Sequence, residues 1–323
     1  MTRAMERLKI NSSDGRIPTA MLEFSQLTLS DIDKLRPFIL QDNSNICDYA
    51  VGGLFIWRDY YSTEYAICDD AVIFMSKDTY NDVNINDIAA MFSLPIGKNL
   101  HRCIEEVVRY CYFNDLPVAF NAITDESLEP LRSTFEKHEL YSDESWSDYI
   151  YRSVDLVKLE GRKYSNKRNH VSQFKRAYEN YAYEKIDNEN LPQIRNFYEE
   201  LCSETDFSAK TAMEQEDHNK TVEVLEKFNV YGLSGGLLRV GDSVVAFSIG
   251  EVKNDTLFVH IEKADMRYKG VYQMMNNEFA RHFATEGVEF INREEDAGDI
   301  GLRASKQSYH PYKLAKKYVF IVR

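Results

Sequence analysis

The sequence contains no long hydrophobic run. None of its segments approaches the 18 or so uninterrupted apolar residues from which a membrane-spanning helix is recognised. The opening stretch, MTRAMERLKINSSDGRIPTA, also lacks the apolar core of a secretory signal. We therefore expect a cytoplasmic chain without integral membrane contact, in which residues 1–20 form a loose leader.

Cysteine is scarce. The five cysteines are odd in number, scattered and without a CxxC pair, which argues against a disulfide framework and against structural zinc. They are Cys47, Cys68, Cys103, Cys111 and Cys202. No Gly-x-Ser-x-Gly motif or other recognised nucleophile motif occurs, which disfavours covalent catalysis. We expect reduced cysteines that serve packing, and no metal site.

Positive charge is in the minority. The chain has 39 Lys and Arg against 52 Asp and Glu, for a net charge of −13. This negative field disfavours non-specific binding to nucleic acid or to an anionic membrane. The exception is the basic segment 162–176, whose cations are Arg162, Lys163, Lys167, Arg168, Lys175 and Arg176. This segment either binds phosphate, with tRNA as one candidate partner, or is a solvated face paired with nearby glutamates.

Length and composition indicate two globular domains. The chain has 323 residues, of which 44% are hydrophobic. Both halves show a hairpin, a strand, a Gly-containing turn, an amphipathic helix and a further strand in the same order. We expect an α/β (α+β) fold of two similar domains in tandem, each with a mixed, mostly antiparallel twisted sheet flanked by helices. The first would span residues 21–155, as a degenerate copy, and the second 156–323.

Hydrophobic spacing places several elements within these halves. Two helices and a strand are expected in the first half: a helix with Leu100, Ile104, Val107, Val108 and Cys111 on one face, a helix over 126–138, and a strand over 146–154. The second half should contain a helix with Val171, Phe174, Tyr178 and Tyr181 on one face, and a helix with the stripe Val271, Met275, Phe279 and Phe283. Between these helices, turns at 241–242 and 254–255 predict a three-stranded antiparallel meander.

The last strand of this meander, TLFVHIEKA, carries two candidate bases. A two-residue period puts Phe258, His260 and Glu262 on one face of the strand. A histidine or a carboxylate can accept the proton of an ammonium acceptor, so both residues qualify by type. The alternatives are a structural histidine and an ion pair on the sheet surface.

The motif Arg267-x-x-Gly270-x-Tyr272 lies between this strand and the next helix. Glycine permits close approach of the backbone, and the first turn of a helix presents unpaired N–H groups to a pyrophosphate. The spacing resembles the R-x-x-G-x-G/A loop of GNAT-type N-acyltransferases, with Tyr272 replacing the final small residue. This resemblance implies that the loop at Gly270, with Arg267, Lys269 and Arg168, holds donor phosphates. The alternative is an ordinary helix N-terminus.

Charge is concentrated after the next strand, in GVEFINREEDAGDIGLRASKQSYHP. Loops at strand ends commonly carry function, so this density suggests a site. The candidate acceptor-binding residues here are Arg293, Glu294, Asp296, Arg303 and Lys306. The alternative is a solvated loop whose arginines pair with its carboxylates.

Several of these segments, in this order, are typical of one family. GRKYSNKRNHVSQF, VHIEKAD, KGVYQMMNNEFA, INREEDAG and GLRASKQSYHP together resemble the C-terminal domain of phosphatidylglycerol lysyltransferases, which is built as tandem GNAT-like domains. The resemblance implies direct transfer of an acyl or aminoacyl group from an activated donor, a coenzyme A thioester or an aminoacyl-tRNA, to an amine or hydroxyl acceptor. No tightly bound cofactor is implied.

The resemblance also implies roles for single residues. Glu262 or His260 would act as the base, and Tyr309, with Tyr312 as the alternative, would protonate the leaving group. Backbone N–H groups of diverging central strands would stabilise the oxyanion. The alternative function is a non-catalytic tandem module that binds a small metabolite, RNA or a partner protein.

Overall fold

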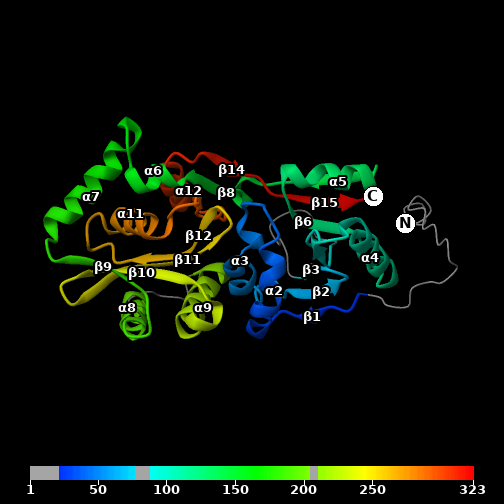
Figure 1. Cartoon of the computed structure of the whole chain (residues 1–323), viewed down its shortest axis with the longest axis horizontal. Coiled ribbons are helices and arrows are strands. Elements are labelled where there is room, and N and C mark those ends of the chain that lie inside the picture. The colour runs from blue at the N-terminus through cyan, green and yellow to red at the C-terminus, as the bar shows by residue number, and fades with distance from the viewer. Residues whose placement is uncertain (1–21, 78–87, 204–209) are drawn as a thin grey trace. The chain divides into compact units, whose positions relative to one another are not determined.

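The computed structural model describes residues 22–77, 88–203 and 210–323. These residues form two compact units, each built on its own sheet (Figure 1). The first unit comprises the described residues of 22–44, 57–146 and 316–323, and the second comprises those of 45–56 and 147–315. The predicted leader, 1–20, lies outside the described residues.

The first unit is a mixed sheet with helices packed against it. Its strands run in the order β1-β2-β3-β4-β6-β15-β7, with β5 paired to β3. The strands are β1 (Ser25–Gln26), β2 (Glu64–Cys68), β3 (Ala71–Ser76), β4 (Met91–Phe92), β5 (Ile96–Gly97), β6 (Ala119–Ile123), β7 (His138–Tyr141) and β15 (Tyr318–Val322). The α-helices are α2 (Ile32–Ile39), α4 (Leu100–Phe113) and α5 (Leu128–Thr134). Only β4 and β6, which α4 connects, pair in parallel among these described strands.

The second unit repeats this connection. Its strands run in the order β14-β8-β13-β12-β11-β10-β9, and only β12 and β13 are parallel among those described. The strands are β8 (Asp148–Arg152), β9 (Tyr181–Lys185), β10 (Ser234–Val240), β11 (Ser243–Lys253), β12 (Thr256–Ala264), β13 (Phe290–Asn292) and β14 (Lys313–Ala315). The α-helices are α3 (Val51–Ile56), α6 (Ser153–Lys158), α7 (Ser165–Ala177), α8 (Leu191–Ser203), α9 (Ala212–Glu226), α10 (Phe228–Tyr231), α11 (Val271–Phe283) and α12 (Ile300–Gln307). The predicted fold class, with two mostly antiparallel sheets flanked by helices, is confirmed.

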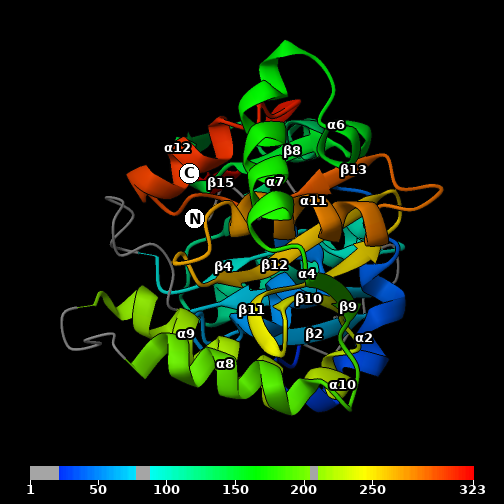
Figure 2. The same cartoon turned by 90° about the vertical axis from the view of Figure 1, so that its left-hand side faces the viewer.

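Helices cover both faces of the second sheet. Leu257 and Val259 pack with Phe279 of α11 and Phe174 of α7 in one hydrophobic core, on what we call the α11 face. On the other side, the α8 face, Phe247 contacts Tyr198 of α8. Figure 2 shows α7 and α11 on one side of strands β10–β12 and α8 and α9 on the other.

Several predicted elements differ in extent from the observed ones. Leu100, expected in the buried stripe of α4, is 46% exposed, and Cys103 is buried instead. The helix predicted over 126–138 ends at Thr134, because the following residues form β7 against β15. Tyr181, expected on a helix, lies in β9, because the chain leaves the helical conformation at Tyr178.

The predicted boundary between residues 155 and 156 does not coincide with the division of the structure. Strand β8 precedes that position, yet it pairs with β13 and β14 in the second sheet. Strand β15, at the C-terminus, pairs with β6 and β7 in the first sheet. The second sheet therefore includes a strand from before the predicted boundary, and the first sheet includes the strand at the C-terminus.

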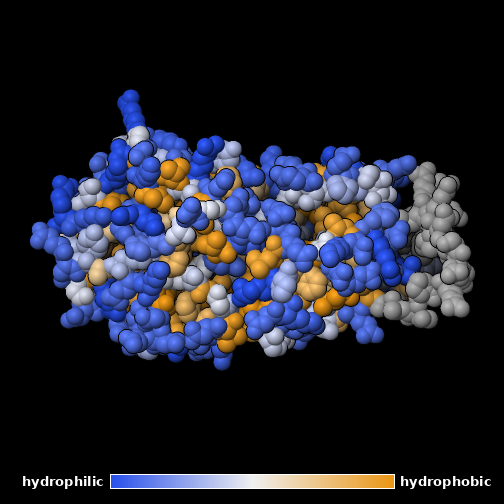
Figure 3. Space-filling view, viewed as in Figure 1, coloured by the Kyte–Doolittle hydropathy of each residue, from blue (hydrophilic) through white to orange (hydrophobic). Residues whose placement is uncertain are grey.

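No helix in the described part of the chain is long and apolar enough to cross a bilayer. On the face shown in Figure 3, hydrophilic side chains cover most of the surface and hydrophobic ones lie among them in small groups.

Strand β15 should be essential to the first core. Phe320 is fully buried, and its ring stacks on His138 with centroids 4.5 Å apart. We predict that Phe320→Ala lowers the free energy of unfolding by about 3–5 kcal/mol, because it leaves a cavity in the hydrophobic core of the first unit. Urea unfolding followed by circular dichroism measures this change.

Phe113→Ala is the matched control, since Phe113 is 61% exposed at the end of α4. It should change stability by about 0.5 kcal/mol or less. Equal losses for the two variants would contradict the assignment of β15 to this core.

Candidate active site

The second sheet splits between β12 and β13. Their parallel pairing ends at Phe258 and Asn292, although β12 continues to Ala264. Past this point, no later residue of the described chain pairs with that edge of β12 in the sheet. β13 itself ends at Asn292, so this edge of β12 is where the predicted oxyanion-stabilising N–H groups would lie, and that role stays a prediction.

A β-bulge in β12 lies within this split. Ile261 is opposite Ile249 of β11, whereas Val259 is opposite Gly250, so His260 is the additional residue. A bulge changes the alternation of side chains along its strand.

This bulge separates the two candidate bases. Phe258 is opposite Glu251 and Glu262 is opposite Ser248 on β11. Because positions 248 and 251 are an odd number of residues apart, their side chains lie on opposite faces of the sheet. His260 contacts Glu251, so it lies on the α8 face and Glu262 on the α11 face. The prediction that they share a face is wrong, because the period of two does not continue through the bulge.

His260 is buried between two carboxylates. Its Nδ1 lies 2.7 Å from Glu294 Oε1, and its Nε2 lies 3.0 Å from Glu251 Oε1, which also accepts from the backbone N–H of Gly52. Burial alone would lower the pKa of the imidazole, but the hydrogen bonds and negative charge of the two glutamates outweigh it and raise the pKa to about 10. His260 is therefore an imidazolium at neutral pH, a form that cannot accept a proton.

Gly52 of α3 has a direct steric role beside this ring. A Cβ at this position would lie 2.2 Å from His260 Cδ2 and Nε2. Only glycine allows the helix to approach the imidazolium so closely.

Glu262 and Arg293 form a second buried ion pair, on the α11 face. Arg293 Nη2 donates to Glu262 Oε1 at 3.3 Å, and the two side chains are 10% and 11% exposed, respectively. The second carboxylate oxygen, Oε2, and the second guanidinium nitrogen, Nη1, are buried without a hydrogen-bond partner. Unsatisfied buried polar atoms are costly, and where they occur together they suggest a place for a ligand.

Tyr309 lies against this pair. The Arg293 guanidinium is 5.1 Å from the centre of its ring, and Lys167 Nζ is 3.8 Å from the same centre. Burial raises the pKa of the Tyr309 phenol well above its usual range, although Arg293 opposes that shift. Lys167 also donates to Ser308 Oγ at 2.6 Å. Sequence analysis placed Lys167 only in the basic segment, because nothing in the sequence distinguishes it from its exposed neighbours.

Five consecutive residues, 292–296, make separate internal contacts. Asn292 donates to Asp148, and Arg293 and Glu294 bind Glu262 and His260. Glu295 accepts from the thiol of Cys47 at 3.3 Å. Asp296 is fully buried and accepts from Tyr149 and, at two oxygens, from Arg303. These contacts hold the loop in one conformation, including Glu294 at a φ of 58°.

The remaining predicted acceptor-binding residues also support the loop. Burial alone would raise the pKa of Asp296, but its bonds to Arg303 and Tyr149 outweigh burial and lower the pKa. Lys306 donates to the backbone oxygens of Glu294 and Glu295. Of the five predicted residues, only Arg293 contributes a buried side-chain atom without a partner. Their role in binding an acceptor stays a prediction.

The predicted donor loop is closely covered by α7. A Cβ at Gly270 would lie 2.7 Å from the backbone oxygen of His170, so this glycine makes room for α7. The backbone N–H of Lys269 donates to the hydroxyl of Tyr178 at 3.3 Å. Arg267 pairs with Asp265 at 2.8 Å, while its side chain is 80% exposed.

The basic segment is partly neutralised. Arg168 donates to the backbone oxygens of Leu159 and Gly161, and Lys175 lies 3.6 Å from Glu278. Arg162 and Arg176 are exposed. The donor-phosphate role of Arg168 therefore stays a prediction, and its guanidinium already caps nearby carbonyls.

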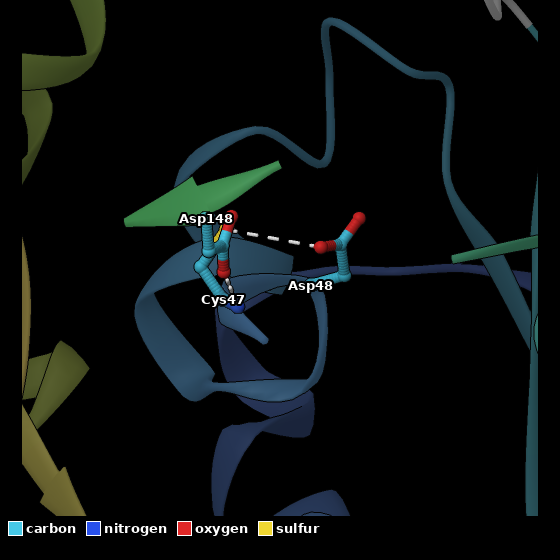
Figure 4. Close-up of side chains that lie close together, drawn as sticks. All are labelled: Cys47, Asp48 and Asp148. Carbon is cyan, nitrogen blue, oxygen red and sulfur yellow. Dashed lines mark hydrogen bonds between the residues drawn. The ribbon is translucent and has the colours of Figure 1, made fainter. Parts of the chain in front are cut away.

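One group of possible metal ligands occurs in the described residues. Ligand atoms of Cys47, Asp48 and Asp148 lie within 4.8 Å of one another (Figure 4). Asp148 is fully buried and accepts from the backbone N–H of Cys47 at 2.6 Å and from Asn292 at 2.7 Å. Both bonds go to Oδ2 of Asp148: the first attaches Cys47 to β8, and the second attaches β13 to β8.

The charge on His260 should appear in the pH dependence of stability. Its pKa is about 10 in the folded protein and near 6.5 when unfolded, so the stabilisation is complete below about pH 6.5 and is lost as pH rises through 10. We predict that the stability advantage of the wild type over His260→Gln falls by up to about 1.4 kcal/mol per pH unit in this window. Urea unfolding of both proteins at about pH 6, 8 and 10 measures this difference in stability. Subtracting the variant removes the contribution of the groups that titrate in both proteins. An advantage independent of pH would contradict the doubly paired imidazolium.

Comparison with known proteins extends these observations. A conserved protein of unknown function from Bacteroides thetaiotaomicron has a TM-score of 0.85 and 28% identity, covering 94% of this chain and 100% of that one. The structure of L-PGS from Bacillus licheniformis has a TM-score of 0.62 and 16% identity, covering 90% of this chain and 91% of that one, which shows a shared fold. An uncharacterised protein of Mycoplasmoides gallisepticum is 26% identical over 206 residues, 61% of this chain. The match covers 62% of that protein, so this chain spans less than two thirds of its length.

The family comparison covers most of the chain. The family described as "Phosphatidylglycerol lysyltransferase, C-terminal" matches residues 43–321, which include all of the second sheet, most of the first, and the split between β12 and β13. The protein therefore belongs to this family, as the sequence resemblance predicted.

Proposed function

We propose that this protein transfers an aminoacyl group from an activated ester to an amine or hydroxyl acceptor by direct attack. The observation that carries the proposal is the Glu262–Arg293 pair, with one buried acceptor oxygen and one buried donor nitrogen unpartnered beside the split sheet. When an amine or alcohol attacks an ester, the attacking group must lose a proton, and the carbonyl oxygen becomes an oxyanion that must be stabilised. These are the two needs that an unpartnered carboxylate oxygen and guanidinium nitrogen meet.

Glu262 is the base in this mechanism. Its Oε2 accepts the proton of the attacking group while Oε1 stays bonded to Arg293. His260, the other predicted candidate, carries its proton between two carboxylates and lies on the opposite face. Its role is to fix Glu294, and with it the neighbouring Arg293, across the split.

Arg293 stabilises the developing oxyanion through Nη1. Backbone N–H groups at the diverging edge of β12 add to this stabilisation, as expected from the sequence. The fixed position of both groups favours the reaction, because a buried, pre-oriented donor needs no reorganisation as charge develops.

The donor favoured here is an aminoacyl ester rather than a coenzyme A thioester. The loop that would hold the coenzyme A pyrophosphate is covered by α7 at Gly270, and Tyr178 occupies the amide of Lys269. The family description, phosphatidylglycerol lysyltransferase, supports an aminoacyl group, and exposed Arg162 and Arg176 offer contacts for tRNA phosphates.

Label transfer tests the proposal. The protein is incubated with tRNA charged with ¹⁴C-labelled amino acids and with phosphatidylglycerol vesicles or small amines, and parallel reactions contain acyl-coenzyme A donors. We expect label to move from charged tRNA to an acceptor. Binding of charged tRNA without transfer would support a non-catalytic module, and transfer from acyl-coenzyme A alone would overturn the donor assignment.

Glu262→Gln should lower the turnover of this reaction by about 100-fold or more, because the variant keeps the shape of the side chain but cannot accept a proton. Glu226→Gln is the matched control, since Glu226 is exposed at the end of α9. Near-ultraviolet circular dichroism establishes that the variants are folded. Full activity of folded Glu262→Gln would remove Glu262 as the base.

A further inference from the structure

Lys167 is a buried ammonium without a counter-ion. The residue is only 8% exposed, and in the described part of the chain no carboxylate lies within ion-pair distance of its Nζ. Its contacts are the Tyr309 ring, 3.8 Å from Nζ to the centre, and Ser308 Oγ at 2.6 Å. A cation–π contact stabilises a buried ammonium, but it leaves N–H groups of Lys167 able to donate to another acceptor.

The charged group facing Lys167 is another cation. Arg293 lies against the same aromatic ring, with its guanidinium carbon 5.1 Å from the ring centre. Burial, and then the charge of Arg293, lower the pKa of the Lys167 ammonium to about 8. This ammonium therefore gives up a proton more readily than an exposed lysine does.

The second observation is the unpartnered pair itself. Glu262 Oε2 and Arg293 Nη1 are buried without partners, and Arg293 contacts the Tyr309 ring that also receives Lys167. The Tyr309 ring thus contacts both the Lys167 ammonium and the Arg293 guanidinium, and Arg293 in turn pairs with the Glu262 carboxylate. A reacting ester beside Glu262 and Arg293 would have its leaving oxygen near a group able to supply a proton.

We propose that Lys167 is the general acid that protonates the leaving oxygen of the donor ester, and that the Tyr309 ring holds its ammonium in position. This assignment rests on the proposed transfer reaction. The acceptor loses a proton to Glu262 as its nitrogen or oxygen bonds to the carbonyl carbon. The bond from that carbon to the leaving oxygen then breaks with its electron pair, and the oxygen takes a proton from Lys167. Proton exchange with solvent returns Glu262 and Lys167 to their starting forms.

This step differs from the role that sequence resemblance implies for Tyr309. The phenol has a pKa above its usual range because it is buried, which makes it a weaker acid than the neighbouring ammonium. The aromatic ring, rather than the hydroxyl, is the part of Tyr309 that both cations contact.

A change of leaving group tests the assignment. Two donors are compared, tRNA ending in adenosine or in 3′-thioadenosine, each charged with the same amino acid. A ribose alkoxide needs a proton to leave, whereas a thiolate leaves without one because a thiol has a pKa of about 8.5. Lys167→Arg keeps the positive charge but holds its proton too tightly to act as an acid.

We expect Lys167→Arg to lower kcat by about 100-fold with the oxygen ester and by less than about 3-fold with the thioester, while KM changes little. Lys227→Arg, the same substitution at an exposed lysine just after α9, should leave both donors unaffected. Tyr309→Phe keeps the ring and should retain at least about a fifth of the activity.

Three results would overturn the assignment. Equal losses for both donors in Lys167→Arg would indicate a structural or binding role, and full activity with the oxygen ester would remove Lys167 from catalysis. A 100-fold loss in Tyr309→Phe, confined to the oxygen ester, would make the phenol the acid. All three leave the proposed transfer reaction standing. Absence of transfer from either donor by the wild type would overturn that reaction, and the assignment with it.

Discussion

The extra residue in β12 determines how the rest of the site is arranged. Because His260 is added at the bulge, Glu262 lies on the opposite face of the sheet. Two adjacent residues after β13, Arg293 and Glu294, reach one face each and meet partners of opposite charge. On the α8 face the cation (His260) comes from β12 and the anion (Glu294) from the loop after β13. On the α11 face the anion (Glu262) comes from β12 and the cation (Arg293) from that loop.

The two ion pairs differ in how completely they are satisfied. On the α8 face, both nitrogens of His260 are bonded, Gly52 packs against the ring, and Lys306 binds the backbone oxygen of Glu294. On the α11 face, one atom of each partner has no hydrogen bond. Unpartnered polar atoms are costly in a buried network. The fully bonded pair on the α8 face therefore positions the loop, and a reacting group on the α11 face would gain the most from new hydrogen bonds. This asymmetry is the physical basis for assigning chemistry to Glu262, Arg293 and Lys167.

Sequence patterns predicted the parts of this structure that depend on local periodicity. The meander, the turns at Gly241 and Asn254, and the buried stripe of α11 follow from alternation and helical spacing, and the structure confirms them. The bulge did not follow, because a single added residue leaves hydrophobic alternation unchanged on each side of it. Because the bulge was not predicted, His260 and Glu262 were expected on one face of the sheet, whereas they lie on opposite faces.

Tertiary contacts account for the other differences. The run at 292–296 was recognised as a dense group of charges, but it has partners at residues 47, 148, 149, 260 and 262, which local patterns do not reveal. Lys167 has the sequence context of a solvated basic helix, and only its packing on Tyr309 distinguishes it. The pairing of strand β15 with β6 and β7 was not predicted, because strand partners far apart in sequence depend on the whole sheet.

The arrangement of the site depends on a charged His260, which links β12 to Glu294 on the α8 face. Its most direct test is the ¹⁵N spectrum of the His260 imidazole in the intact protein at about pH 8, where an ordinary histidine is neutral. We predict that both ring nitrogens carry protons, each bonded to one glutamate. A single protonated nitrogen would contradict the account, because the two faces would then not be joined by ion pairs of opposite polarity.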